Sequence, residues 1–269
     1  MTDVLGLQGK PTLVVGGGSG IGRAAAVLLG QVGAAVAVAD LDRDRAEQVA
    51  KEVGGQAVVG NVLDEAGATA VVDQAHEALG GLTGVINIIG LASWSDLMSL
   101  DLATWEADIR MNLTQHLFVG RAAARHMLQE GGGALAMVTS VSGIYGAPMH
   151  AAYGAAKAGA IDLVRSMANE WSPHGIRVNS VAPDIIATPR VVAGLRESGG
   201  GDLNDLNETA ARDGVPLRRF GTPEEIAGPL VFLLSELSSF MTGQTLIVDG
   251  GTHARFPHGS VFTPMTASG

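Results

Sequence analysis

A glycine-rich segment near the start of the chain limits most strongly the fold that this sequence can adopt. Thr12 to Val15 is a short apolar, β-branched run that is typical of a buried strand. Glycines follow at positions 16, 17, 18, 20 and 22, and an alanine- and leucine-rich segment from about Arg23 predicts a helix. In this order, the glycines let the backbone approach a pyrophosphate, and the helix N-terminus offers free N–H groups. The segment therefore predicts a dinucleotide site rather than a merely flexible turn.

An acidic residue follows the second predicted strand, which covers residues 34–39. Asp40 stands at about the distance from the glycines at which a carboxylate accepts hydrogen bonds from an adenosine ribose and repels a 2′-phosphate. Leu41 follows it, and neither Lys nor Arg interrupts the glycine turn. NAD is therefore favoured over NADP. Arg43 and Arg45 could turn toward a phosphate, but a solvated helix start is the favoured interpretation of both.

Strands and helices alternate along the rest of the chain. Further strands are predicted over residues 56–59, 85–89, 135–139, 176–181 and 245–248, and helices over residues 41–53, 64–79, 100–129 and 223–234. This alternation predicts an α/β fold with a parallel sheet, helices on both faces and right-handed crossovers. The chain has 269 residues, which is compatible with one large domain. We expect this domain to cover residues 1–251 and a tail to cover residues 252–269.

The composition excludes several classes of protein. The formal net charge is −10 and the basic residues are scattered, which argues against nucleic acid or an anionic membrane as a partner. The chain has no cysteine, so disulfides and thiolate metal sites are excluded, and we expect no metal site. The N-terminus lacks the pattern of a secretory signal, and no apolar run is long enough to span a bilayer. These features predict a cytoplasmic protein.

Three polar residues around the strand predicted at 135–139 carry the clearest chemical signal. Ser140 stands where that strand ends, and Tyr153 and Lys157 lie one turn apart near the start of the following helix. An ammonium near a phenol favours the phenolate and lowers its pKa, so that the phenol can exchange a proton with an alcohol. The serine hydroxyl would hold the same substrate oxygen. Tyr-x-x-x-Lys alone is a weak signal, and the preceding serine strengthens it.

Two further segments bear on this site. Asn112 lies within the long helix predicted at residues 100–129, where an asparagine favours a local distortion that offers a backbone carbonyl to a water. Residues 191–215 are polar and contain the glycine-rich stretch 198–201. A glycine-hinged loop of this length beside a site predicts a small lid, at about residues 189–215.

Taken together, these motifs resemble the short-chain dehydrogenase/reductase family over nearly the whole chain. The glycine turn from Val15 to Gly22 is similar to the family's phosphate-binding motif, and Ser140, Tyr153, Lys157 and Asn112 match its four catalytic positions. Residues 179–183 and Thr188 look like the segment that holds the nicotinamide amide. Residues 218–235 and 242–251 look like the family's C-terminal signature.

The resemblance implies a single Rossmann-type domain with a doubly wound, seven-stranded parallel sheet, usually in a homotetramer or a homodimer. Tyr153 would be the acid/base, Lys157 would hold the nicotinamide ribose, Ser140 would orient the substrate oxygen, and Asn112 would anchor a water in a proton relay. The expected cofactor-binding residues are Gly16, Gly18, Ser19, Gly20, Ile21, Gly22, Asp40, Leu41, Asn61, Val62, Asn87, Gly90, Tyr153, Lys157, Pro183, Ile186 and Thr188.

The chain departs from the family pattern at four places. Val15 replaces a threonine that braces the glycine turn, and Asn61 replaces an aspartate that meets the adenine. Residues 87–90 read Asn-Ile-Ile-Gly in place of Asn-Asn-Ala-Gly, so apolar packing is expected where the family has polar contacts. Asp184 replaces a glycine beside the substrate pocket, where its carboxylate either recognises a polar substrate or turns into solvent.

The predicted function is hydride transfer between NAD and a secondary alcohol or ketone of largely apolar character, such as a cyclic alcohol, a steroid-like compound or a hydroxyacyl substrate. By analogy, the pocket would be lined by Leu91, Trp94, Ser142, Tyr145, Met149, His150, Asp184, Ile186 and Val192. Three alternatives remain: a 3-oxoacyl thioester reductase, an NAD-binding redox regulator without turnover, and a sugar-nucleotide epimerase or dehydratase. The four catalytic positions count against the regulator, and the glycine spacing counts against the epimerase.

Overall fold

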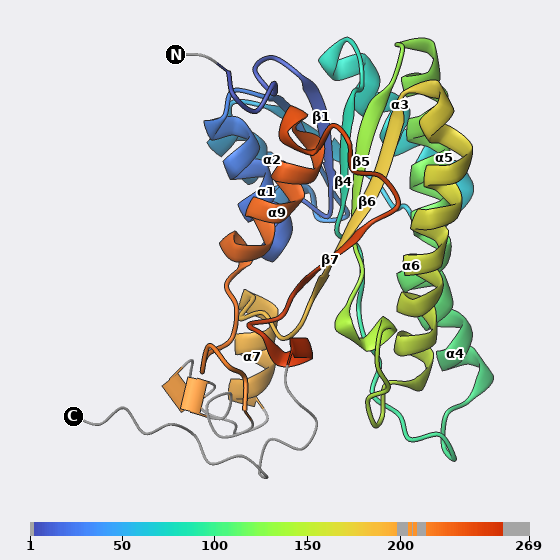
Figure 1. The fold of residues 1–269 in the computed structure, drawn as a ribbon, viewed down its shortest axis with the longest axis vertical. Helices are drawn as coiled ribbons and strands as arrows, with labels where there is room; N and C mark the ends of the chain where they lie inside the picture. The colour runs from blue at the N-terminus through green and yellow to red at the C-terminus, as the bar shows by residue number, and fades with distance from the viewer. Residues whose placement is uncertain (1–2, 198–203, 206, 209–213, 255–269) are drawn as a thin grey trace.

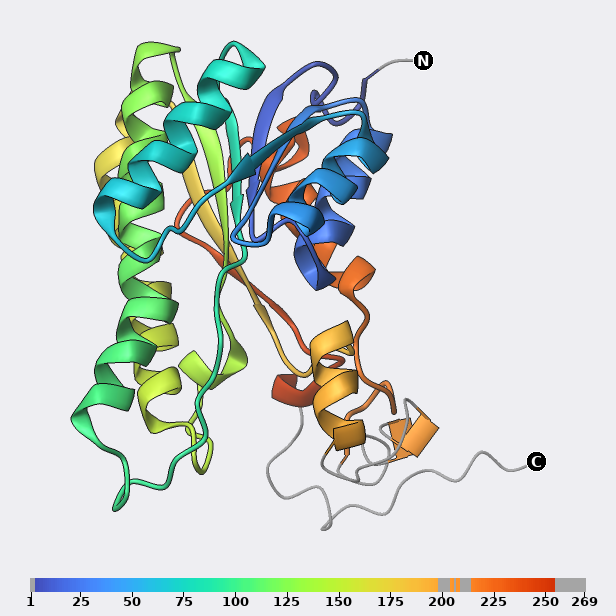
Figure 2. The ribbon, with the colours of Figure 1, turned by 180° about the vertical axis from the view of Figure 1, so that it is seen from behind.

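The computed structural model describes residues 3–197, 204–205, 207–208 and 214–254 (Figures 1 and 2). Its strands are β1 (Pro11–Val15), β2 (Ala35–Asp40), β3 (Gln56–Val59), β4 (Gly84–Asn87), β5 (Gly133–Val138), β6 (Ile176–Pro183) and β7 (Thr245–Val248). Its longer helices are α1 (Gly20–Gln31), α2 (Arg43–Val53), α3 (Glu65–Leu79), α4 (Leu102–Ile109), α5 (Gln115–Gln129), α6 (Ala151–Trp171), α7 (Pro189–Glu197) and α9 (Pro223–Leu234).

The strands form one seven-stranded parallel sheet in the order β3-β2-β1-β4-β5-β6-β7, which confirms the predicted fold class. From β1 the chain proceeds outward through β2 and β3 and then returns to β4 on the other side of β1. In an open α/β sheet, ligands bind beside such a reversal, outside the carboxyl ends of the strands. The topology therefore places the glycine turn after β1 at the expected ligand-binding edge.

Both faces of the sheet are covered, as Figure 1 shows. Leu13 and Val15 of β1 pack with α3, α5 and α6, whereas Val14 between them packs with α1, α2 and α9. Successive side chains of a strand point to opposite faces, so a strand covered on both sides is apolar at every position. This burial is the reason that β1 reads as a continuous apolar run.

Several element boundaries differ from the sequence-based expectation. Helix α1 begins at Gly20 rather than near Arg23, and β4 ends at Asn87 rather than at residue 89. Helix α2 begins at Arg43 because the Asp42 carboxylate caps it, accepting the Arg45 N–H at 3.1 Å. The helix predicted at residues 100–129 is interrupted by a π-helical turn (η1, Arg110–Thr114), which is the distortion expected around Asn112.

Only part of the predicted lid and tail can be described. Helix α7 covers the first part of the predicted lid and lies near the carboxyl ends of the strands (Figure 1). The glycine-rich stretch 198–201 and tail residues 255–269 are outside the described residues. Within the described part of the chain, no helix combines the length and apolarity that a membrane span requires.

Candidate active site

The glycine turn is braced by the strand beside it. The carbonyl oxygen of Ala39 accepts hydrogen bonds from Gly16 N–H at 2.8 Å and from Gly17 N–H at 2.9 Å. The Asp40 carboxylate accepts the Gly18 N–H at 3.0 Å. Val15 cannot supply the hydrogen bond of the threonine that it replaces, and these three bonds from β2 hold the turn instead.

The shape of this turn fits a dinucleotide. A Cβ atom at Gly22 would come within 1.9 Å of the Gly16 carbonyl oxygen, so the close approach of turn and helix requires glycine there. Ser19 precedes α1 and makes no side-chain capping bond, which leaves N–H groups of the first turn for an anion. A Cβ at Gly20 would lie 3.4 Å from the Thr188 methyl carbon. The segment expected to hold the nicotinamide thus meets the glycine turn at one edge.

Ser140, Tyr153 and Lys157 converge just beyond the carboxyl end of β5. The Ser140 hydroxyl lies close enough to the Tyr153 phenol to lower its pKa. The Lys157 ammonium lies 5.7 Å from the centre of the Tyr153 ring and donates a 2.9 Å hydrogen bond to the Val138 carbonyl. The side chain of Lys157 is buried, with 1% of its surface exposed. The sequence spacing therefore translates into the expected spatial cluster.

Burial dominates the electrostatics of this cluster. It lowers the pKa of Lys157 to about 7. It also raises the pKa of Tyr153 above its ordinary value, and the nearby Ser140 hydroxyl offsets part of that rise. The expectation that the ammonium would lower the pKa of Tyr153 is therefore wrong for this structure. The reason is that removing the phenolate from water outweighs the other influences on it.

Asn112 holds the loop after β4 against this cluster. Its Oδ1 accepts the Leu91 N–H at 2.9 Å, and its Nδ2 donates to the carbonyls of Leu91 at 2.8 Å and Asp108 at 3.1 Å. A Cβ at Gly90 would come within 2.9 Å of the Lys157 ammonium nitrogen. The loop can approach Lys157 this closely because residue 90 is a glycine.

A closed set of hydrogen bonds compensates for the unusual residues after β4. The Asn87 amide donates to Gln115 Oε1 at 2.8 Å, Gln115 donates to the Ile89 carbonyl at 3.1 Å, and Ile89 N–H donates back to Asn87 at 3.2 Å. Ile88 packs with the core on the α1 and α9 side, and Ile89 packs with the core on the opposite side. The expected apolar substitution is present, and Gln115 adds polar contacts that the sequence analysis did not predict.

An aromatic shelf, defined here as Trp94, His150 and Tyr153, lies on the predicted substrate side. The rings of Trp94 and His150 are 4.0 Å apart, and those of His150 and Tyr153 are 5.4 Å apart. Met149 adopts the left-handed backbone conformation, with φ of 65°, and its carbonyl accepts the Ser95 N–H at 3.0 Å. Such strain is stored mainly at functional sites. The shelf brings two predicted substrate residues against the predicted acid/base.

The remaining predicted site residues lie outside the cluster of Ser140, Tyr153 and Lys157. Asp184 is partly buried, and burial raises the pKa of its carboxyl. Asn61 accepts the Leu63 N–H of its own loop at 3.0 Å. Five others lie at or just beyond the carboxyl ends of the strands. Leu41 is exposed, Val62, Pro183 and Ile186 are buried, and Ser142 donates its N–H to the Ser140 hydroxyl oxygen at 3.1 Å. Val192 lies in the first turn of α7 and donates its N–H to the Thr188 carbonyl at 3.0 Å.

Sequence reasoning missed three buried polar residues near the site: Asp108, Gln115 and His116. Asp108 accepts the Ser93 hydroxyl at 2.6 Å. Gln115 and His116 follow Asn112 at the spacing of one helical face. Three polar residues on one face of an otherwise apolar helix could have indicated a buried polar site.

Comparisons with known proteins identify relatives of this chain in sequence and in structure. A family model described as enoyl-(acyl carrier protein) reductase matches residues 16–253. 2-(S)-hydroxypropyl-CoM dehydrogenase 3 of Xanthobacter autotrophicus is 36% identical over 92% of this chain and 98% of its own length. Cis-4-hydroxycyclohexanecarboxylate dehydrogenase of Sinomonas cyclohexanicum is 39% identical over 90% of this chain and 96% of its own length. A solved 7α-hydroxysteroid dehydrogenase, in complex with NADH and 7-oxo glycochenodeoxycholic acid, superposes with a TM-score of 0.83 at 30% identity, covering 93% and 96% of the two chains.

Proposed function

Since the chain belongs to the short-chain dehydrogenase/reductase family of nicotinamide-dependent oxidoreductases, we propose that it transfers hydride between NAD and a secondary alcohol of largely apolar, cyclic character. The observation that carries this proposal is the convergence of Ser140, Tyr153 and Lys157 beside the glycine turn. NAD, when bound, supplies the hydride acceptor. The residues of the chain supply the proton transfer and the positioning.

The choice of NAD over NADP is supported by the charges after β2. Asp40 presents a carboxylate beside the glycine turn, and its two oxygens retain capacity to accept ribose hydroxyls. The two nearby cations are engaged: Arg43 pairs with Glu47 at 3.2 Å and Arg45 with Asp42 at 3.3 Å. These pairs oppose the capture of a 2′-phosphate.

In the proposed reaction, Tyr153 takes the proton of the alcohol while hydride leaves the same carbon. Ser140 donates a hydrogen bond to the substrate oxygen and holds it at the phenol. Lys157 lies below the tyrosine ring and passes the proton onward. The loop from Gly90 to Leu91, held by Asn112, closes the site from the β4 side.

The substrate class is supported by the apolar surface around this cluster. Exposed Trp94 and Met149 stand at its rim with Leu91, Tyr145 and Ile185. A flat apolar ring would be expected to bind against the aromatic shelf. Two of the three relatives named above take their names from a hydroxycyclohexanecarboxylate and a hydroxysteroid, and the third from a linear hydroxypropyl compound. We extend the ring chemistry of the first two to this chain.

The proposed assembly is a homotetramer in the cytoplasm. Strand β7 forms one edge of the sheet, and an exposed edge offers unpaired backbone groups to another chain. Phe240 is fully exposed beside it, and Leu237 and Ile247 are also exposed. Burying this apolar surface against a second copy would stabilise both copies. Sedimentation of the purified protein measures the assembly directly.

The test of the function is a panel of secondary alcohols supplied with NAD, followed by the absorbance of the reduced cofactor. Cyclic alcohols are expected to react, and linear polyols to react poorly. The second candidate, reduction of a 3-oxoacyl thioester, is favoured by a relative, the 3-oxoacyl-[acyl-carrier-protein] reductase of Thermotoga maritima, which is 34% identical over 91% of this chain and 98% of its own length. It is tested in the reverse direction. Absence of turnover with every substrate, together with tight NAD binding, would instead favour the regulator.

A further inference from the structure

An imidazole at the rim of the candidate active site lacks a hydrogen-bond partner. His150 directly precedes α6 and stands three residues before Tyr153. Its ring packs against two other aromatic rings, with 4.0 Å between the ring centres of His150 and Trp94 and 5.4 Å between those of His150 and Tyr153. Its Nε2 atom is enclosed and forms no hydrogen bond within the described residues. Enclosed polar atoms are nearly always paired in folded proteins, so this nitrogen indicates a partner from outside the chain.

The backbone around His150 is strained and is held from two sides. The preceding residue, Met149, adopts the left-handed conformation, with φ of 65°, and its carbonyl accepts the Ser95 N–H at 3.0 Å. The His150 carbonyl accepts the Gly154 N–H at 2.7 Å. Strained residues that their surroundings hold in place concentrate at ligand-binding sites. These contacts fix where His150 stands relative to Tyr153.

The imidazole is uncharged at neutral pH. Burial lowers the pKa of His150, and the Asp108 carboxylate offsets only part of that effect. A neutral imidazole has one donor and one acceptor nitrogen. A hydroxyl group both donates and accepts, so it can pair with Nε2 in either tautomer. A carboxylate only accepts, and the negative charge of Asp108 would also repel it.

The enclosure of Nε2 is compatible with binding a ligand. The Trp94 side chain that packs against His150 is itself 69% exposed. A side chain that lies mostly in solvent can shift at little cost, and a substrate ring can then take its place against the imidazole.

We propose that His150 determines specificity by binding a second hydroxyl group of the substrate, so that the preferred substrates are cyclic diols with neighbouring hydroxyls. The inference rests on the proposed function and narrows its substrate class. One hydroxyl would lie at Tyr153 and Ser140 and give its proton to the phenol, while hydride leaves its carbon for NAD. The other would bond to His150 Nε2, which neither gains nor loses a proton, and the product would be a hydroxyketone. Because the imidazole packs against the Tyr153 ring, the two hydroxyls have to be close together.

Two substrates that differ by one hydroxyl test this role. With NAD and the unaltered enzyme, we expect kcat/KM for the better isomer of 1,2-cyclohexanediol to exceed that for cyclohexanol by about tenfold, the effect of one hydrogen bond. His150→Phe keeps an aromatic ring against Trp94 and Tyr153 but removes both nitrogens. The ratio should therefore fall to about one, while kcat/KM for cyclohexanol stays within about threefold.

Two further variants control for packing. His150→Gln keeps a donor and an acceptor and should retain a preference for the diol of at least about threefold. His174→Phe makes the same replacement at an exposed position after α6 and should leave the ratio unchanged.

Binding to the complex with NADH tests the inference without turnover. An alcohol cannot transfer hydride to the reduced cofactor, so calorimetry with NADH measures affinity alone. The diol should bind about tenfold more tightly than cyclohexanol to the unaltered protein and equally tightly to His150→Phe. That result would support the role of His150 even if the panel of alcohols gave no reaction. The proposal is overturned if the two alcohols bind the unaltered protein equally, if His150→Phe keeps the preference, or if 2-hydroxycyclohexanecarboxylate is preferred to the diol.

Discussion

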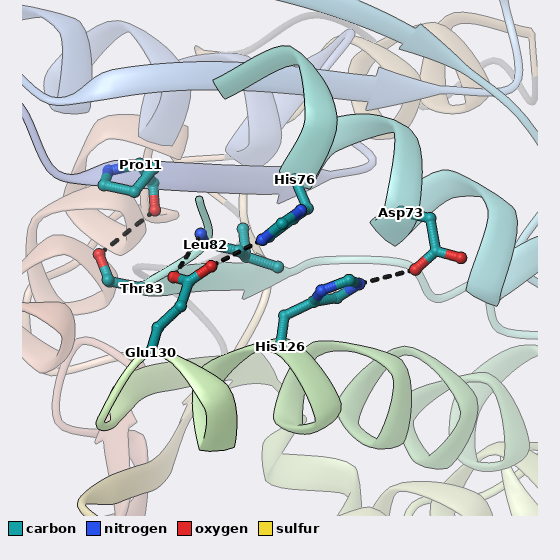
Figure 3. A network of polar contacts seen from close by, with 7 residues as sticks. All are labelled: Pro11, Asp73, His76, Leu82, Thr83, His126 and Glu130. Atoms are coloured by element: carbon teal, nitrogen blue, oxygen red, sulfur yellow. Dashed lines mark hydrogen bonds and ion pairs between the residues drawn. The ribbon is translucent and has the colours of Figure 1, made fainter. Parts of the chain in front are cut away.

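Two clusters of polar side chains serve different purposes in this molecule. In the first, around Lys157, the charged and polar groups are buried at the carboxyl ends of the strands. In the second, shown in Figure 3, His76 and His126 of α3 and α5 stack at 4.1 Å, and each bonds a carboxylate at 2.7 Å. Their partners are Glu130 and Asp73, and Glu130 also accepts the buried Leu82 N–H at 2.8 Å.

The difference between the clusters is their access to water. The His76–His126 network is partly exposed, so its charges remain hydrated and its hydrogen bonds add modestly to stability. The Lys157 cluster has lost its water, so the pKa values of Lys157 and Tyr153 move away from their ordinary values. Perturbed groups of this kind concentrate at functional sites. The Lys157 cluster therefore destabilises the folded chain and supplies groups for proton transfer. The His76–His126 network instead stabilises the fold.

The largest expected effect tests the chemistry of the buried cluster. Tyr153→Phe removes the proton-transferring hydroxyl and should lower kcat by about a thousandfold, while fluorescence titration still shows NAD binding. The matched control is Tyr145→Phe, which removes the only other phenol of the chain and should keep kcat within a few-fold. Turnover close to that of the unaltered enzyme in Tyr153→Phe would remove the acid/base role.

The next prediction tests whether burying the Lys157 side chain lowers the free energy of unfolding. The pKa of Lys157 is about 7 in the folded chain against an ordinary value of 10.5, so between these values the unfolded chain binds more protons. The free energy of unfolding should therefore increase with pH between about 7 and 10.5. The destabilisation that comes from burying the Lys157 charge is greatest below pH 7. Lys157→Met should abolish turnover, flatten this slope and raise the free energy of unfolding at pH 6 by about 3 kcal/mol.

Urea unfolding at several pH values measures this effect. Lys51→Met, which removes an exposed lysine of α2, is the control and should leave the slope unchanged. A Lys157→Met protein that is less stable than the unaltered chain at pH 6 would contradict the contrast between the two clusters.

A smaller effect is expected at the edge of the ligand site. Asp40→Ala removes the carboxylate that we propose binds the ribose and that accepts the Gly18 N–H. NAD affinity should fall by about 10- to 100-fold, because hydrogen bonds to a charged acceptor are lost, whereas NADP affinity should change little. Side-by-side titrations measure both, with Asp44→Ala on α2 as the control. A stronger affinity for NADP in the unaltered protein would show that the cofactor assignment is wrong.

The smallest effect belongs to the network in Figure 3. Glu130→Ala leaves the buried Leu82 N–H without its acceptor and removes the partner of His76. The free energy of unfolding should fall by about 1–2 kcal/mol with kcat unchanged. Glu77→Ala, at an exposed position of α3, should cost less. If Glu130→Ala impaired catalysis as strongly as Tyr153→Phe, the two clusters would not be separate in function.

The sequence by itself determined the architecture and the positions of the predicted catalytic residues. Burial on both faces makes the central strands β1 and β5 continuous apolar runs. Glycine spacing and Tyr-x-x-x-Lys are local patterns that a single segment carries. These local patterns were enough to predict the parallel sheet, the cofactor edge and the meeting of Ser140, Tyr153 and Lys157.

Tertiary structure alone decided how these residues behave. The pKa of Tyr153 depends on how much water surrounds it, and Gln115 pairs with Asn87 only because α5 packs beside the end of β4. The replacement of the missing threonine by bonds from Ala39 and Asp40 likewise requires β2 beside β1. Burial and pairing between distant segments are properties of the packed chain, so no spacing along the sequence encodes them directly.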